Sequence, residues 1–220
     1  MSPNICTNKL VITGPLAELR HFRKKAKGRA PRYADDPKSV EMPEEELCFH
    51  QMVPIPASLL AQGHNEPAAN SLNNCGNEWE YETWGCSCGA RNVTVQLTPS
   101  APVSFLTYDF KTFWDPPKHL ILIVSRWCYG LIFEIRYAGV WDERIAGVFI
   151  AKNGQVLADH KWHADLEYLP ESWGLIMVSG GGQEGKKDEP KSERDGCLQN
   201  GPTQTNTKAT TSEPATSTMQ

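Results

Sequence analysis

Two stretches in which apolar and polar residues alternate, joined by a proline-containing turn, constrain the fold of this chain most. They cover residues 92–97 and 106–111. Because a period of two places successive side chains on opposite faces of a strand, the pattern predicts a hairpin with one buried face. Bends marked by tryptophan bracket this hairpin, at Trp84-Gly85 before the first strand and at Trp114-Asp115-Pro116-Pro117 after the second.

Apolar stripes at helical spacing predict two helices. The first stripe follows a strand at residues 10–13 and stops before Gly28; it consists of Leu16, Leu19, Phe22 and Ala26. The second helix is expected to begin at Asp115, which can cap it, and to end at Gly130. Its stripe consists of Leu120, Ile123, Val124, Trp127 and Cys128.

Further strands are predicted on both sides of the hairpin. They cover residues 47–52, 131–138, 148–151 and 156–158. Asn153-Gly154 tolerates the positive φ angles of a tight turn between the last two. Residues 62–78 indicate a surface insertion, and residues 78–82 alternate acids with aromatics as an edge strand would. The order predicts an α+β fold: a ferredoxin-like split βαβ sheet with two helices on one face and an added C-terminal hairpin.

Composition divides the chain into two parts. Residues 1–178 carry the apolar periodicity, whereas residues 179–220 contain Gly, Ser, Thr, Pro, Lys and Glu but no aromatic residue. A segment of that kind cannot bury enough apolar surface to offset its ordering entropy. We therefore expect one α+β domain at residues 1–178 and a disordered polar tail at residues 179–220.

Charge and cysteine content restrict the class of protein. The formal net charge of -4 argues against a surface that embraces nucleic acid throughout. No apolar run of membrane-spanning length and no signal-like segment occurs, and the 7 cysteines are an odd number, which favours reduced thiols. We expect a cytoplasmic protein.

The cysteines and histidines offer two kinds of chemical site. A metal site would join Cys86 and Cys88 with Cys75, or with His160 and His163, but the paired knuckles of structural zinc sites are missing. The alternative is a pair of partly buried thiols at a tight bend.

A nucleophilic cysteine would need a base such as His50 or His64, and no spacing links either histidine to a thiol. No phosphate-binding loop occurs. The prediction is a protein without enzymatic activity, metal or cofactor.

A basic cluster offers one binding hypothesis. It consists of Arg20, Arg23, Lys24, Lys25 and Lys27. Cations at this density can meet phosphates, as in a nucleic-acid-binding ferredoxin-like module. The alternative is a solvated helix end balanced by the acidic segment that follows at residues 35–46.

Tryptophans at bends and loops offer a second binding hypothesis. They are Trp79, Trp84, Trp114 and Trp141. Aromatic residues so placed can anchor a protein partner. The alternative is that they close the ends of the sheet as a small core of their own.

Several short motifs, in order along residues 3–158, resemble the YubB-type ferredoxin-like domain family of bacterial plasmids and phages. The matching segments are residues 3–14, Phe49 with residues 53–56, Trp84-Gly85 with residues 91–93, residues 110–117, and Gly147 with Asn153-Gly154. After Trp-Gly the family commonly has threonine, lysine and tryptophan, whereas this chain has Cys86-Ser87-Cys88.

The resemblance implies a ferredoxin-like fold and an accessory protein of a phage or mobile element in a bacterial cytoplasm, with no established activity. The leading hypothesis is a small non-enzymatic protein that binds and modulates a host or phage protein. The alternative is a nucleic-acid-binding module that uses the basic cluster at residues 20–32.

Overall fold

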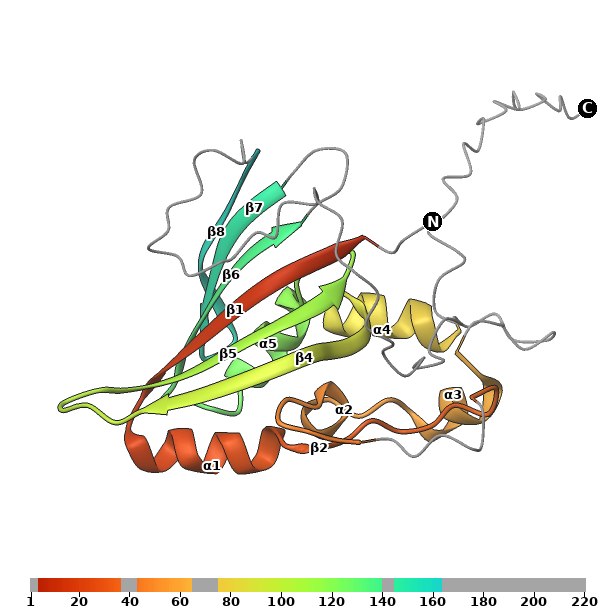
Figure 1. Cartoon of the computed structure of the whole chain (residues 1–220), viewed down its shortest axis with the longest axis horizontal. Coiled ribbons are helices and arrows are strands. Elements are labelled where there is room, and N and C mark those ends of the chain that lie inside the picture. The colour runs from red at the N-terminus through yellow and green to blue at the C-terminus, as the bar shows by residue number, and fades with distance from the viewer. Residues whose placement is uncertain (1–3, 37–42, 65–74, 140–144, 164–220) are drawn as a thin grey trace, which may run out of the picture.

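A computed structural model describes residues 4–36, 43–64, 75–139 and 145–163, and these residues form a mixed α+β arrangement (Figure 1). Within them, a six-stranded antiparallel sheet has the order β4-β5-β1-β6-β7-β8, and β2 pairs with β3 separately. The strands are β1 Ile5–Gly14, β2 Gly28–Arg29, β3 Glu44–Glu45, β4 Ser87–Thr98, β5 Ser104–Phe113, β6 Ile132–Gly139, β7 Ile145–Lys152 and β8 Gln155–His163. The helices are α1 Leu16–Ala26, α2 Phe49–Met52, α3 Ala57–Gln62, α4 Gly76–Trp84 and α5 Lys118–Ser125.

Strand β1 lies in the middle of the sheet and pairs with β5 on one side and β6 on the other. Its side chains alternate between the two faces, as the period of two requires. Leu10 and Ile12 are buried on one face, whereas Lys9 and Val11 are half-buried on the other. The sheet therefore has a core face and a more open face.

The helices cover the core face. Phe22 of α1 packs edge-on against Tyr108 of β5 and Phe133 of β6, with ring centroids 6.5 and 5.5 Å apart. Leu120 and Val124 of α5 are buried in the same core. Figure 1 shows α1 along one side of the sheet and α5 behind it. Both helices therefore contribute to the core on this face of the sheet, and the predicted α+β class is confirmed.

The predicted hairpins are both present. Strands β4 and β5 pair as expected, although β4 is longer than its alternating segment and carries two register shifts. Strands β7 and β8 are joined by Asn153 and Gly154 at φ 52° and 73°. Positive φ at both turn positions suits a tight hairpin, and Asn-Gly is the pair that tolerates it best.

Among the described helices, none has the length and apolar character needed to cross a membrane.

The strand predicted at residues 47–52 is wrong, because residues 49–52 form the short helix α2. Leu47 lies in a bend, and Cys48 enters the helix as extended chain, with its N–H donating to Ala26 O at 2.7 Å. The Ile55 N–H donates to His50 Nδ1 at 3.0 Å just after the helix. A short apolar run fits a strand or a buried helical turn equally well, and tertiary contacts chose the latter.

The acidic strand expected at residues 78–82 is also wrong, because these residues belong to α4. Gly76, Glu80 and Trp84 are buried at helical spacing. Gly85 ends the helix in the left-handed conformation, with φ 88° and its N–H on Tyr81 O at 2.9 Å. The helical period places Glu80 in the interior. The predicted strand had placed this residue on a solvated edge of the sheet.

Helix α5 is shorter than the sequence pattern predicts. It begins at Lys118 rather than at Asp115, and it ends at Ser125, five residues before Gly130. Trp127, which the pattern placed on the buried stripe, is 60% exposed. Pro116 and Pro117 are both buried ahead of the helix, so the chain turns there before its first helical turn.

The predicted tail at residues 179–220 lies outside the described residues.

Two leucines of α5 give a matched test of the core. Leu120 is 2% exposed, whereas Leu122 is half-buried. We expect Leu120→Ala to lower the free energy of unfolding by about 2–5 kcal/mol, because it leaves a cavity under the helix. Leu122→Ala should cost about 1 kcal/mol or less. Urea unfolding followed by circular dichroism measures both, and equal losses would contradict the packing described here.

Candidate protein-binding surface

Trp114 follows β5 directly and combines two unusual properties. Its side chain is 40% exposed, and its backbone has φ 66°. Positive φ is uncommon for a residue with a side chain and persists only where the surroundings enforce it. The backbone N–H of Trp114 donates to Asn4 O at 2.9 Å, which fixes the bend to the start of β1.

Buried hydrogen bonds hold the loop that carries Trp114. Asn8 is fully buried, and its amide donates to Thr112 Oγ1 at 2.9 Å and to Cys6 O at 3.1 Å. The Thr112 hydroxyl in turn donates to Asp115 O at 2.8 Å. Buried polar groups are retained when they are hydrogen-bonded in this way, and such a network rigidifies its surroundings. The loop is therefore positioned from inside the sheet.

Two further exposed side chains belong to residues that contact the chain neighbours of Trp114. Tyr81 of α4 is 43% exposed, and its hydroxyl donates to the Asp115 carboxylate. Ile5 of β1 is 39% exposed and pairs with Phe113, the residue before Trp114. We call Ile5, Tyr81 and Trp114 the Trp114 surface. Partial burial, together with the Asp115 carboxylate, raises the pKa of Tyr81, so its hydroxyl keeps its proton and continues to donate.

An arginine supports the same region. The Arg91 guanidinium lies 4.6 Å from the centroid of the Phe113 ring, which is 6% exposed. This cation–π contact joins β4 to the end of β5. Tryptophan, tyrosine and arginine are the residue types that most often dominate the energy of protein interfaces.

The other predicted anchors are placed differently. Trp84 is 3% exposed, its indole N–H donates to Val53 O at 3.1 Å, and its ring packs edge-on against Phe49 and Trp79. Trp79 is half-buried against the same core. These two tryptophans correspond to the alternative interpretation, a small core that closes the end of the sheet. Trp141 lies outside the described residues.

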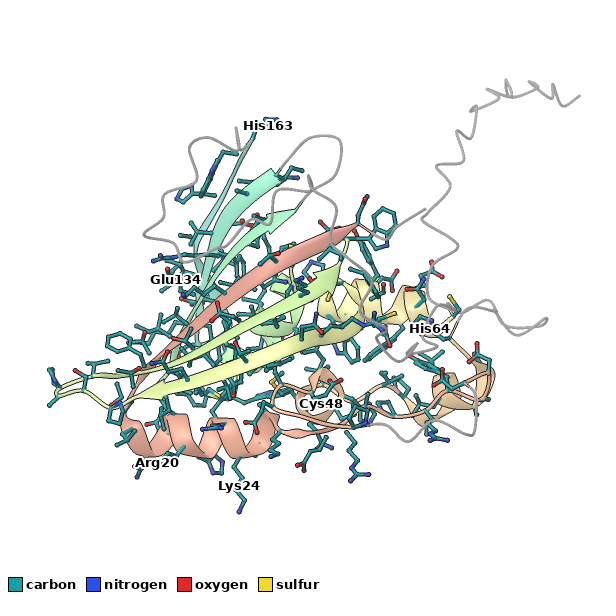
Figure 2. All side chains as sticks on the ribbon, viewed as in Figure 1. Arg20, Lys24, Cys48, His64, Glu134 and His163 are labelled. Carbon is teal, nitrogen blue, oxygen red and sulfur yellow. The ribbon has the colours of Figure 1, made fainter. Side chains whose placement is uncertain are left out.

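The basic cluster on α1 is partly neutralised. Arg23 contacts the Glu46 carboxylate at 3.0 Å, and Lys27 contacts both Glu44 and Glu46 at 3.1 Å. Hydrogen bonds from Lys27 and Arg23 lower the pKa of Glu46. Arg20, Lys24 and Lys25 are exposed, and Figure 2 shows Arg20 and Lys24 pointing away from the body of the protein. The cluster is thus a helix end balanced in part by the acidic segment after it.

The open face of the sheet is balanced in a similar way. Lys9 lies 3.9 Å from Asp109 on the neighbouring strand β5. Arg136 contacts Glu134 of its own strand at 2.6 Å. Both pairs are partly exposed, so each contributes little to stability, but they reduce the positive potential that phosphates would meet.

The metal site considered from sequence is not formed by its nominated histidines. Cys86 and Cys88 lie on or next to β4 and His160 and His163 on β8, at opposite edges of the sheet. Five strand spacings separate these edges by roughly 24 Å. Figure 2 likewise shows His163 and His64 in different regions. The structure instead brings His64 within 3.9 Å of the Cys88 sulfur, a proximity that no spacing in the sequence signals.

Sequence reasoning missed several exposed aromatic residues, among them Tyr81, Trp127 and Tyr129. Tyr81 was hidden by the incorrect strand assignment, Trp127 was placed on the apolar stripe of the second helix, and Tyr129 was given no role. Trp127 and Tyr129 are 60% and 73% exposed after α5. No sequence signal identified Tyr81 as a surface residue, because the buried positions of α4 are Gly76, Glu80 and Trp84, which do not form an apolar stripe.

Comparison with known proteins identifies a shared fold. No protein-family model matches the chain, and no curated protein matches it. A crystal structure of the protein api92 from Yersinia pseudotuberculosis, of family DUF1281, is similar with a TM-score of 0.54 and 10% sequence identity. The similarity covers 74% of this chain and 99% of that one. At this identity the likeness concerns the fold alone, and it supports the α+β architecture described above.

Proposed function

We propose that this chain is a small non-enzymatic module that binds and modulates a protein partner through the Trp114 surface. The observation that carries the proposal is an exposed tryptophan held at positive φ by a buried hydrogen-bond network. The exposed part of the Trp114 indole contributes little to the stability of the folded chain. A strained backbone retained at such a residue points to a role outside the folded chain.

Preorganisation is the physical advantage of this arrangement. A partner that buries Trp114 meets a loop whose conformation is already fixed, so little ordering entropy is lost on binding. Tyr81 and Ile5 extend the apolar area around the indole, and Asp115 offers a carboxylate at its edge. Aromatic anchors bordered by polar groups are typical of the centres of protein interfaces.

The order of the strands supports a ferredoxin-like assignment within this proposal. Along the chain, β1, α1, β4, β5, α5 and β6 form a βαββαβ series, and β4-β5-β1-β6 is their order in the sheet. Strands β7 and β8 then extend the edge, as the added hairpin was expected to do. This arrangement is what the YubB-type resemblance implies, and with it a setting as an accessory protein of a phage or mobile element in a bacterial cytoplasm.

Nucleic acid is the less favoured partner. Ion pairs engage Arg23 and Lys27 in the basic cluster, and ion pairs also occur on the open face of the sheet. Binding of phosphates would have to compete with these carboxylates. The remaining cations of α1 lie on the side opposite the open face, where no Phe, Tyr or Trp of the helix is exposed for base stacking and His21 is the exposed ring.

The partner proposal is tested by comparing two exposed tryptophans. Tagged full-length wild type, Trp114→Ala and Trp127→Ala are used to recover proteins from bacterial lysate, and the recovered partner is then purified. We expect wild type and Trp127→Ala to bind it equally. Trp114→Ala should weaken the dissociation constant by roughly 30-fold or more, since an interface hot spot is worth about 2 kcal/mol or more.

Isothermal titration of the purified pair gives these constants, and circular dichroism checks that both variants are folded. Unchanged affinity of Trp114→Ala, or an equal loss in both variants, would rule out the Trp114 surface. Failure to recover any partner would count against a protein-binding role.

The nucleic-acid alternative has its own measurement. We expect no salt-sensitive rise in fluorescence anisotropy when labelled single- or double-stranded DNA or RNA is titrated with the full chain. Phosphate binding by the cluster would instead give an affinity that falls steeply with salt and is reduced by Lys24→Glu. That result would replace the protein-binding proposal for this face.

A further inference from the structure

A second group of functional side chains lies between α3, α4 and β4. Glu80 and His64 are 3% and 8% exposed. His64 Nε2 lies 3.3 Å from Glu80 Oε2 and 3.9 Å from Cys88 Sγ. One ligand atom from each residue lies within 4.8 Å of the others. A nitrogen, an oxygen and a sulfur donor therefore converge on one point.

Cys88, His64 and Glu80 are not arranged as a catalytic triad of nucleophile, histidine and carboxylate. In such a triad one ring nitrogen of histidine faces the nucleophile while the other is held by the carboxylate. Here the same atom, His64 Nε2, faces both Cys88 and Glu80. A single centre shared by all three groups is the geometry expected of ligands around an ion.

The carboxylate of this group is oriented by further contacts. Glu80 Oε1 accepts from the Tyr33 hydroxyl at 2.8 Å, and Glu80 Oε2 accepts from the Cys88 N–H at 2.6 Å. Burial and the nearby Glu80 carboxylate raise the pKa of Tyr33, so its hydroxyl remains a donor. The Asp35 carboxylate accepts from the His64 N–H at 2.8 Å. Supporting hydrogen bonds of this kind characterise metal ligands.

Two of the three ligand separations can be compared directly with zinc geometry, and the third, between Glu80 and Cys88, is at most 4.8 Å. Nitrogen and oxygen ligands about 2.0–2.1 Å from a tetrahedral Zn²⁺ lie about 3.3–3.4 Å apart, and nitrogen and sulfur ligands about 3.5–3.6 Å apart. The His64–Glu80 separation of 3.3 Å meets the first value. The His64–Cys88 separation of 3.9 Å exceeds the second by about 0.3 Å, which a small rotation of a side chain supplies.

We propose that the thiol form of this protein binds one Zn²⁺ through Cys88 Sγ, His64 Nε2 and Glu80 Oε2, with water as the fourth ligand. Cysteine, histidine and glutamate are each zinc ligands, and three protein ligands plus water is the coordination of open zinc sites. Binding displaces the proton of the Cys88 thiol and any proton on His64 Nε2, so affinity falls as the pH is lowered. This site is independent of the Trp114 surface.

Cys88 is disulfide-bonded in the structure, so metal binding at this site requires that the disulfide first be reduced. A disulfide sulfur cannot supply the thiolate that zinc requires. A phosphine reductant breaks the bond by donating two electrons; the phosphine takes oxygen from water, and the two hydrogens of that water complete two thiols. Metal binding and the Cys88 disulfide therefore exclude each other.

The test uses full-length protein, freed of metal with a chelator and divided into phosphine-reduced and untreated samples. Both are titrated with Co²⁺, whose thiolate charge-transfer absorption reports sulfur ligation. We expect one equivalent bound with this absorption in the reduced sample, displacement by one equivalent of Zn²⁺, and no such band in the oxidised sample.

Variants then identify the ligands. Cys88→Ser should abolish the charge-transfer band, and His64→Ala should weaken Co²⁺ binding at least tenfold. Cys128→Ser and His163→Ala, at a thiol and a histidine elsewhere, should leave both unchanged. Thiol alkylation of reduced wild type, read by mass spectrometry, requires no variant: Zn²⁺ should slow modification of Cys88 selectively.

Absence of stoichiometric binding by the reduced wild type would overturn the proposal. So would a charge-transfer band that survives in Cys88→Ser, or zinc protection of a cysteine other than Cys88. Binding that His163→Ala removes would assign the ion to the β8 histidines and equally reject this site.

Discussion

Pairing of β1 on both of its sides is the constraint on which the rest of the structure depends. This strand is hydrogen-bonded to β5 along Ile5–Gly14 and to β6 along most of the same length. Its buried side chains meet α1 and α5 on one face, so the sheet and both main helices share one core. Displacing β1 by one residue would exchange its two faces and expose the whole apolar set.

The same strand carries the polar contacts that position the Trp114 surface. Asn8 occupies a core position where an apolar side chain would pack as well, yet its amide reaches Thr112 and thereby the loop at Asp115. A buried amide is tolerated because its partners are within hydrogen-bond distance. It gives the loop a single conformation, which is what a preorganised binding surface requires. Helix α4 contributes to both proposed sites. Glu80 is a ligand of the proposed zinc site, and the adjacent residue Tyr81 belongs to the Trp114 surface.

The sequence predicted the long elements well and the short ones poorly. Alternation over β5 and the stripe of α1 each extend over enough residues to distinguish a strand from a helix. Residues 47–52 and 78–82 were assigned to strands because a short apolar run and a short alternation of acids with aromatics fit more than one period, and their contacts with the core decided for helices. The sequence did not separate Trp114 from Trp84, since both lie at bends. Trp84 is buried because Phe49 and Val53, which are remote in sequence, cover it.

By itself, the sequence determined the α+β class, the two hairpins and the two principal helices, because periodicity and turn residues act locally and a one-dimensional pattern records them. Only the tertiary structure decided which aromatic residues face solvent and that Glu44 and Glu46 neutralise part of the basic cluster. It also decided that the histidine near Cys88 is His64, and not one of the two histidines of β8. These outcomes depend on contacts between segments far apart along the chain. Burial and electrostatic interaction are set by that proximity, and no spacing of residue types encodes it.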